Sequence, residues 1–133
     1  MKNSEISQFI HEYCRAFRPG NINEIIKYFH YPTTMLVNGM NLHVASSVEL
    51  EPLLSSGLSD MKSKGFSYSK IQDLYIHSLS EKIAIVSASY IRFKSDDTAL
   101  EEIAATYTIF NDSELGCGIV TIIAHELDKV IGK

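Results

Sequence analysis

Two ionisable side chains stand where strand-forming residues predict a sheet, and they are the best candidates for acid–base chemistry. His125 follows directly on the apolar run 119–124, and a histidine ending such a strand can act as base, acid or hydrogen-bond donor. Asp73 lies in the strand-like segment 71–75, although aspartate is uncommon inside strands. Each also has a simpler interpretation, because His125 can be a packed strand-end residue and Asp73 a solvated carboxylate at a sheet edge.

Tyrosines and one arginine form a second group of candidates, and these point to binding. A tyrosine is apolar in body with one polar tip, which suits the wall of a small-molecule cavity, although a core tyrosine has the same character. Arg92 shares a predicted strand face with Tyr90, so its guanidinium either reaches water along its stem or recognises a carboxylate. The candidate ligand-binding residues are Tyr13, Tyr31, Tyr90, Arg92 and Tyr107.

Other chemical motifs are missing from the sequence. It contains no glycine-rich phosphate loop, no Gly-x-Ser-x-Gly elbow and no His-Glu-x-x-His helix. Cys14 and Cys117 have no His or Cys nearby at ligand spacing, which argues against zinc and against a disulfide framework. The other histidines show no mutual spacing typical of a metal site: His11, His30, His43 and His77. We therefore expect neither a metal nor a cofactor.

Composition limits the classes of protein that remain. With 133 residues, of which 45% are hydrophobic, the chain fits one globular domain spanning residues 1–133. Twelve Lys and Arg against sixteen Asp and Glu give a net charge of -4 without a basic block, which disfavours nucleic acid as a partner. No apolar run approaches the ~20 residues that span a bilayer, and the N-terminus has no signal core. These features predict a cytoplasmic protein without a membrane partner.

The first half of the chain predicts three helices and a hairpin. Apolar residues at helical spacing predict a helix over 4–17 with Ser4 as its N-cap, and a second helix runs from Asn21 to the stop at Pro32. Asn38-Gly39 between two apolar strands, 33–37 and 40–44, is typical of a type I′ turn. A third helix follows from a Ser46 cap to Gly65, with a kink or irregular first turn expected at Pro52.

The second half predicts an antiparallel meander over 67–78, 82–94, 100–111 and 115–126. Its second strand is apolar on both faces, whereas a sheet with one solvated face alternates apolar with polar residues. Two apolar faces need two covers, and the helices supply only one. The pattern therefore predicts a homodimer that pairs through the sheet.

The whole order is an α+β arrangement, ααββαββββ, with three N-terminal helices covering one face of a curved antiparallel sheet. Three segments carry a more specific likeness: 9–17, 20–32, and 105–110 ahead of a last strand that ends in His125. In these the chain resembles the nuclear transport factor 2-like superfamily, a cone-shaped fold shared by ketosteroid isomerases, polyketide cyclases and many uncharacterised small bacterial proteins.

The resemblance implies a pocket between the concave sheet face and the helices, and dimers formed through the convex face. Isomerase-like members use an Asp or Glu base beside a Tyr and a protonated acid. Three functions stay open. The first is binding of a small apolar or amphipathic molecule in a tyrosine-lined pocket. The second is a cofactor-free isomerase, cyclase or hydratase with His125 or Asp73 as base. The third is a structural domain whose interior is filled.

Overall fold

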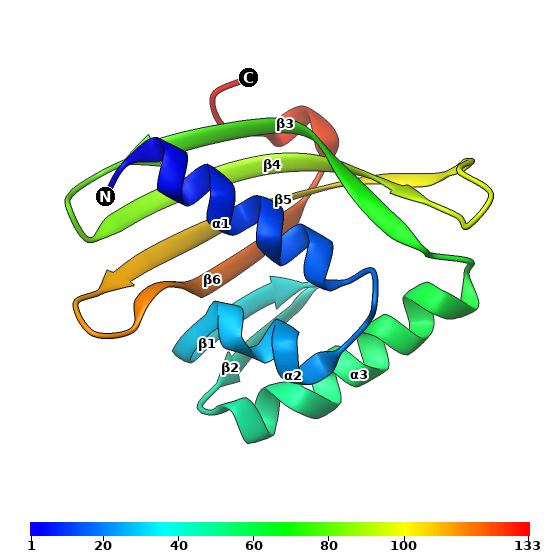
Figure 1. The fold of residues 1–133 in the computed structure, drawn as a ribbon, viewed down its shortest axis with the longest axis horizontal. Coiled ribbons are helices and arrows are strands. Elements are labelled where there is room, and N and C mark those ends of the chain that lie inside the picture. The colour runs from blue at the N-terminus through cyan, green and yellow to red at the C-terminus, as the bar shows by residue number, and fades with distance from the viewer.

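A single curved sheet of six strands organises the molecule (Figure 1). The computed structural model describes residues 1–133, and the strand order across the sheet is β2-β1-β6-β5-β4-β3. All neighbouring strands are antiparallel except β1 and β6, so the sheet is mixed where antiparallel pairing throughout was expected. The strands are β1 Phe29–Val37, β2 Met40–Val44, β3 Tyr68–Ser78, β4 Ile83–Phe93, β5 Ala99–Asp112 and β6 Gly116–His125.

Local signals explain why the strand predictions agree with the structure. Asn38 and Gly39 adopt φ values of 52° and 72°, the two positive values that a type I′ turn requires between β1 and β2. Each meander strand begins and ends within a few residues of its predicted bounds. The direction of β1 against β6 has no such local signal, because about eighty residues separate the two strands and no hairpin turn joins them.

The helices differ more from the prediction. Helix α1, Asn3–Ala16, begins before Ser4, with Lys2 at the N-cap position and no side-chain cap. Helix α3, Ser47–Ser63, is capped by Ser46 as predicted and runs through Pro52 as one helix. The second helix is only a turn, α2 Ile22–Ile25, followed by the 3₁₀ segment η1 Ile26–Tyr28.

The expectation that the second helix runs to Pro32 is therefore wrong. Strand β1 begins at Phe29, which pairs with Ile119 of β6 and is buried. Tyr31 precedes a proline, a position biased toward extended backbone, and Pro32 itself lies within the strand. Long-range pairing with β6 thus outweighs the helical periodicity of this segment.

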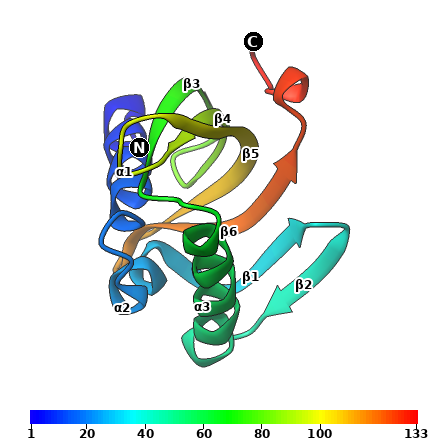
Figure 2. The same cartoon turned by 90° about the vertical axis from the view of Figure 1, so that its right-hand side faces the viewer.

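Helix α1 covers the inner, concave face of the sheet, while α2 and α3 lie beyond it toward β1 and β2 (Figures 1 and 2). The core between them is apolar, with Ile6 and Ile10 of α1 fully buried against Val86 and Ile109 of the sheet. The C-terminal segment 126–133, which includes the 3₁₀ turn η2 Leu127–Lys129, lies on the opposite face from α1 (Figure 2). The sheet therefore has a helix-covered face and an outer face that the C-terminal segment covers in part.

Candidate functional site

A cavity of about 90 Å³ lies between the C-terminal half of α1 and the inner face of β4 and β5. The edge of β3 and the end of α3 complete its wall. Its lining is mostly apolar and aromatic, with polar atoms supplied by hydroxyls, a thiol and one guanidinium: Tyr13, Cys14, Phe17, Met61, Ser69, Tyr90, Arg92, Ile103 and Tyr107. Such a lining, apolar with a few convergent polar groups, is typical of a ligand site.

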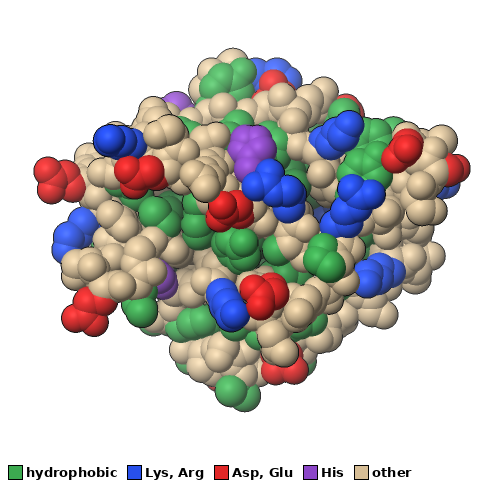
Figure 3. All heavy atoms as spheres, in the orientation of Figure 1, with side chains coloured by type: hydrophobic (Ala, Val, Ile, Leu, Met, Phe, Trp, Pro, Cys, Tyr) green, Lys and Arg blue, Asp and Glu red, His purple; other side chains and the backbone are tan.

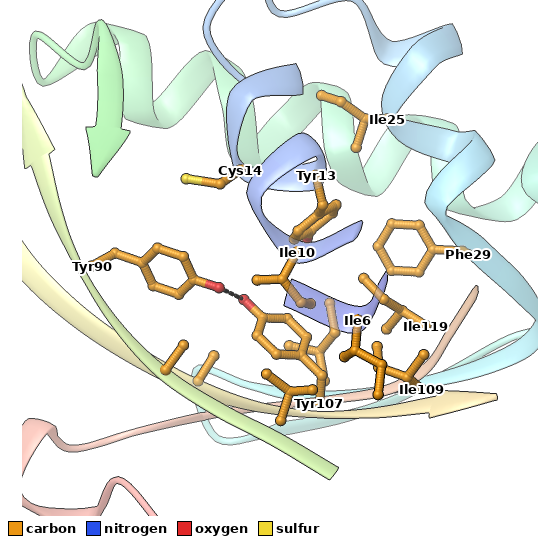
Figure 4. Close-up of a cluster of buried hydrophobic side chains, with 14 of the residues drawn as sticks. Ile6, Ile10, Tyr13, Cys14, Ile25, Phe29, Tyr90, Tyr107, Ile109 and Ile119 are labelled. Atoms are coloured by element: carbon orange, nitrogen blue, oxygen red, sulfur yellow. Dashed lines mark hydrogen bonds between the residues drawn. The ribbon is translucent and has the colours of Figure 1, made fainter. Parts of the chain in front are cut away.

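Two buried tyrosines meet at the floor of this cavity (Figure 4). The hydroxyl oxygens of Tyr90 and Tyr107 lie 2.8 Å apart, and both side chains are nearly inaccessible to solvent. Between them on the sheet lie Ala88 and Ala105, which are register partners on β4 and β5. Because alanine has only a methyl group, the two rings can lean toward each other over this pair. Tyr13 packs edge-on against Tyr107, with ring centroids 6.0 Å apart.

Burial keeps these hydroxyls protonated. Desolvation raises the pKa of Tyr13, Tyr90 and Tyr107 well above that of an exposed tyrosine, since the phenolate would lose its hydration. The hydrogen bond from Tyr107 opposes this rise in the pKa of Tyr90, and the Arg92 charge opposes it for the other two. In a pair of neutral hydroxyls one donates to the other, so the second hydroxyl proton is left for a guest molecule.

Arg92 brings a positive charge to the same cavity. Its Nη1 lies 3.3 Å from Oε1 of Glu101, the register partner of Arg92 on β5. Its Nε atom is buried and has no hydrogen-bond partner. A guanidinium offers five donors, so one ion pair leaves most of its hydrogen-bonding capacity unused.

Cys14 closes the cavity from α1, and its Sγ lies 3.7 Å from the carbonyl oxygen of Ser69. Burial raises the pKa of this thiol to about 11. Since the thiolate is the nucleophilic form, the thiol is a poor nucleophile near neutral pH. It therefore acts as part of the wall.

Asp73 lies on the outer face of the sheet, away from the cavity. It accepts a hydrogen bond from Ser89 Oγ at 2.9 Å and contacts Lys133 Nζ at 3.1 Å. These two hydrogen bonds, with that from Lys133 the stronger influence, hold the pKa of Asp73 below its ordinary value. A carboxylate held ionised in this way is an ion-pair partner for the C-terminal segment.

His125 also lies on the outer face, at one end of a chain of hydrogen bonds. Its Nδ1 donates to the carbonyl oxygen of Glu126, which can only accept, so in the neutral ring Nε2 accepts from Thr106 Oγ1 at 2.7 Å. Thr106 in turn accepts from Ser87 Oγ at 2.8 Å, and Ser87 accepts from the amide of Ile131 at 2.9 Å. The chain ties the C-terminal segment to the sheet.

A β-bulge in β3 and another in β6 explain why Asp73 and His125 both face outward. On β3 the register shifts between Ile71 and Asp73, so that Ile71 pairs with inner-face Tyr90 whereas Asp73 pairs with outer-face Ser89. On β6 a second shift follows buried Ile119 and carries His125 to the outer face. Strict alternation would have placed Asp73 on the face of Ile71, and His125 on that of Ile119.

Unlike Asp73 and His125, most of the predicted ligand-binding residues lie together in the cavity. Tyr13, Tyr90, Arg92 and Tyr107 all line the one cavity. Tyr31 does not, because its hydroxyl donates to the carbonyl oxygen of Ile26 at 3.1 Å, on β1 away from the cavity. The structure thus brings four of the five residues together and separates them from Asp73 and His125.

The fold and the cavity invite comparison with known families. The model of a family described as NTF2-like protein (DUF6841) matches residues 4–127, almost the whole chain. The chain belongs to this NTF2-like family. No curated protein is similar to it in sequence.

Solved NTF2-like structures share the fold at low sequence identity. A protein of unknown function from Shewanella oneidensis has 16% identity and a TM-score of 0.75, covering 95% of this chain and 100% of its own. A cystatin-like protein from Novosphingobium aromaticivorans has 14% identity and a TM-score of 0.74, covering 96% and 83%. A Catenulispora acidiphila protein in complex with S-DNPA has 10% identity and a TM-score of 0.70, covering 91% and 90%. At these identities the likeness shows the fold alone.

Sequence reasoning missed part of the lining of this NTF2-like cavity. Phe17 stands four residues after Tyr13 and three after Cys14, so the buried face of α1 was a usable signal. Met61 and Ser69 gave no such signal, because they reach the cavity only through the path of the chain from α3 into β3.

No group of His, Cys, Asp and Glu side chains is arranged to hold a metal ion. None of the helices has the length and apolar character that crossing a bilayer demands.

Proposed function

We propose that this NTF2-like protein binds a small molecule in the cavity between α1 and the inner face of β4 and β5. One observation supports this most: polar groups with unused hydrogen-bonding capacity, Arg92 and the Tyr90–Tyr107 pair, stand in a mostly apolar, partly enclosed cavity. Buried polar groups normally have partners, so a guest molecule or water completes this set. The NTF2-like structure that holds S-DNPA shows a ligand in another protein of this fold.

The size of the cavity limits the ligand. Its 90 Å³ is smaller than the roughly 150 Å³ of an engineered protein cavity that takes benzene. Drug-sized ligands occupy pockets of about 300 Å³ or more. The ligand therefore has few non-hydrogen atoms, or binds while α1 and the end of α3 move apart.

The alternative, a cofactor-free isomerase, cyclase or hydratase, needs a base on the same side of the sheet as the tyrosine pair. His125 and Asp73 both lie on the other side and are engaged with the C-terminal segment. Within the cavity the protonated thiol of Cys14 and the guanidinium of Arg92 are poor bases near neutral pH. Glu101, the carboxylate beside the cavity on the tyrosine side, is engaged in the ion pair with Arg92. The geometry therefore favours binding without turnover.

A fragment titration tests the binding proposal. Small fragments of differing charge, each of up to about five non-hydrogen atoms because the cavity is smaller than one that takes benzene, are added to ¹⁵N-labelled protein. We expect amide shifts at α1, β4 and β5. Cys14→Met fills the cavity and should abolish them, whereas the matched variant Cys117→Met, on β6 outside the lining, should not. The proposal is contradicted if no fragment shifts these amides, or if the shifts persist in Cys14→Met.

We also propose that two copies pair through the part of the outer face that the C-terminal segment leaves open. Leu36 and Ile123, register partners on β1 and β6, are 39% and 38% exposed there. No charged side chain lines the hollow that they share with Asn38 and Asn41, so two identical patches can meet without like-charge repulsion. Light scattering should give twice the 14.9 kDa chain mass, and Ile123→Glu should give a monomer. A monomeric mass for the unaltered chain would contradict the pairing.

A further inference from the structure

The polar end of the cavity is formed by a guanidinium with donors to spare. The side chain of Arg92 is 22% exposed, and its only ion-pair partner is Glu101 at 3.3 Å, longer than the roughly 2.7–2.9 Å of a strong charge-assisted hydrogen bond. The Nε atom of Arg92 has no partner although it is buried. A planar guanidinium that makes one long contact can still receive a second carboxylate across its fork.

The surface next to the cavity is cationic. Two hollows of about 310 and 350 Å³ adjoin the cavity, sharing Cys14 and Ser69 with it, and both are lined by Arg15 and Lys70. Arg18 lines the second hollow and lies over the Tyr68 ring, 4.6 Å from its centroid.

None of these three cations takes part in an ion pair, although the chain as a whole carries a net charge of -4. On the face seen in Figure 3, several Lys and Arg side chains gather over the region where α1 ends. An uncompensated group of one sign beside a cleft raises the local concentration of ligands of the opposite sign.

The other residues that line the cavity indicate the chemical character of the rest of the ligand. Phe17, Ile103 and Met61 offer only apolar surface, and the Tyr90–Tyr107 pair offers a hydroxyl donor. We infer that the ligand is a short-chain organic acid, with its carboxylate on the Arg92 guanidinium and its apolar body among the aromatic side chains. This inference rests on the proposed binding function and gives it a ligand class.

A comparison of two isosteres tests the inference on the unaltered protein. Propionate and propionamide have the same heavy-atom skeleton and differ in charge, so both suit the cavity in size. ¹⁵N amide titrations should show propionate binding at least tenfold more tightly than propionamide, with shifts at β4, β5 and the C-terminal half of α1. The affinity for propionate should fall as salt increases, because the cations beside the cavity are exposed.

Two charge variants should shift the propionate affinity in opposite directions. Arg92→Met keeps the length of the stem and should weaken propionate binding at least tenfold, while its effect on propionamide stays within about twofold. Glu101→Gln removes the competing carboxylate and should tighten propionate binding several-fold. Lys27→Met removes one charge from an exposed ion pair on η1, outside the cavity lining, and serves as the control with unchanged affinity.

The outcomes separate this inference from the proposed function. Equal affinity for propionate and propionamide, or propionate binding that Glu101→Gln weakens, overturns the carboxylate assignment and leaves the cavity as a binding site for neutral molecules. Propionate shifts confined to the surface around Arg15 and Lys70, reproduced by inorganic phosphate, also overturn it, because the anion then does not enter the cavity. If neither isostere nor any fragment perturbs the cavity amides, the proposed function fails together with the inference.

Discussion

Removing one hydroxyl from the Tyr90–Tyr107 pair should destabilise the fold by more than a single hydrogen bond is worth. The two oxygens lie 2.8 Å apart in a buried site, so Tyr90→Phe leaves the Tyr107 hydroxyl without its protein partner. A buried hydrogen bond contributes about 1 kcal/mol net, whereas an orphaned buried hydroxyl costs about 1 to 3 kcal/mol. We expect each single Phe variant to lose about 1.5 to 2 kcal/mol, within that range.

The double variant should lose less than the sum of the two single variants, since no hydroxyl is then left orphaned. A coupling of about 1 kcal/mol between the two positions follows from the same values. For 133 residues, at an unfolding entropy of about 2.1 cal/mol/K per residue, each 1 kcal/mol lowers Tm by about 4 °C.

Urea unfolding followed by far-UV circular dichroism measures the cycle, because the chain has no tryptophan to report by fluorescence. Tyr28→Phe is the control, since its hydroxyl makes no hydrogen bond within the chain and its loss should cost under about 0.5 kcal/mol. Additive losses in the double variant, or single losses no larger than that of the control, would refute the reasoning that each hydroxyl is the hydrogen-bond partner of the other.

Three further results follow from the geometry. Cys14, with its pKa raised to about 11, should react with iodoacetamide at pH 8 about a hundredfold more slowly than a free thiol when Cys117 is replaced by serine, and a free-thiol rate would contradict its burial. Because the fold lowers the pKa of Asp73, its ion pair stabilises the folded protein at pH values above the unfolded-state pKa of about 3.9. This stabilisation is lost as the pH falls through the folded-state pKa. The stability lost in Lys133→Met should therefore be present at pH 7 and vanish near pH 2, and an equal loss at both would exclude the ion pair as its cause. Val130 is only 6% exposed, and Val130→Ala removes two buried methyl groups, so this variant should lower the free energy of unfolding by about 1.5 kcal/mol if the C-terminal segment packs on the sheet. No measurable loss in an unfolding assay would exclude that packing.

Strands and turns could be predicted from the sequence because their signals are local. The Asn38-Gly39 turn and the polar breaks between the meander strands fix where each strand ends. The second helix could not be predicted, because Phe29 pairs with Ile119 some ninety residues later and this contact overrides the local periodicity. The parallel direction of β1 and β6 likewise depends on contacts between distant segments.

In the candidate site, too, local features could be predicted from the sequence and long-range ones could not. Tyr90 and Arg92 alternate on one strand without a bulge between them, so their shared face could be predicted from spacing alone. Asp73 and His125 follow bulges, and a shift of one residue moves a side chain to the other face of the sheet. A bulge leaves no reliable mark in a single sequence, so the separation of these two residues from the tyrosines became visible only in the structure.

The most direct test of ligand binding in the cavity is an isotope-filtered NOESY spectrum of the protein saturated with propionate. We expect cross-peaks from the propionate methyl protons to the ring protons of Tyr13 and Tyr107, which line the cavity. Cross-peaks only to residues of the outer face, or none to any residue of the lining, would contradict binding in the cavity.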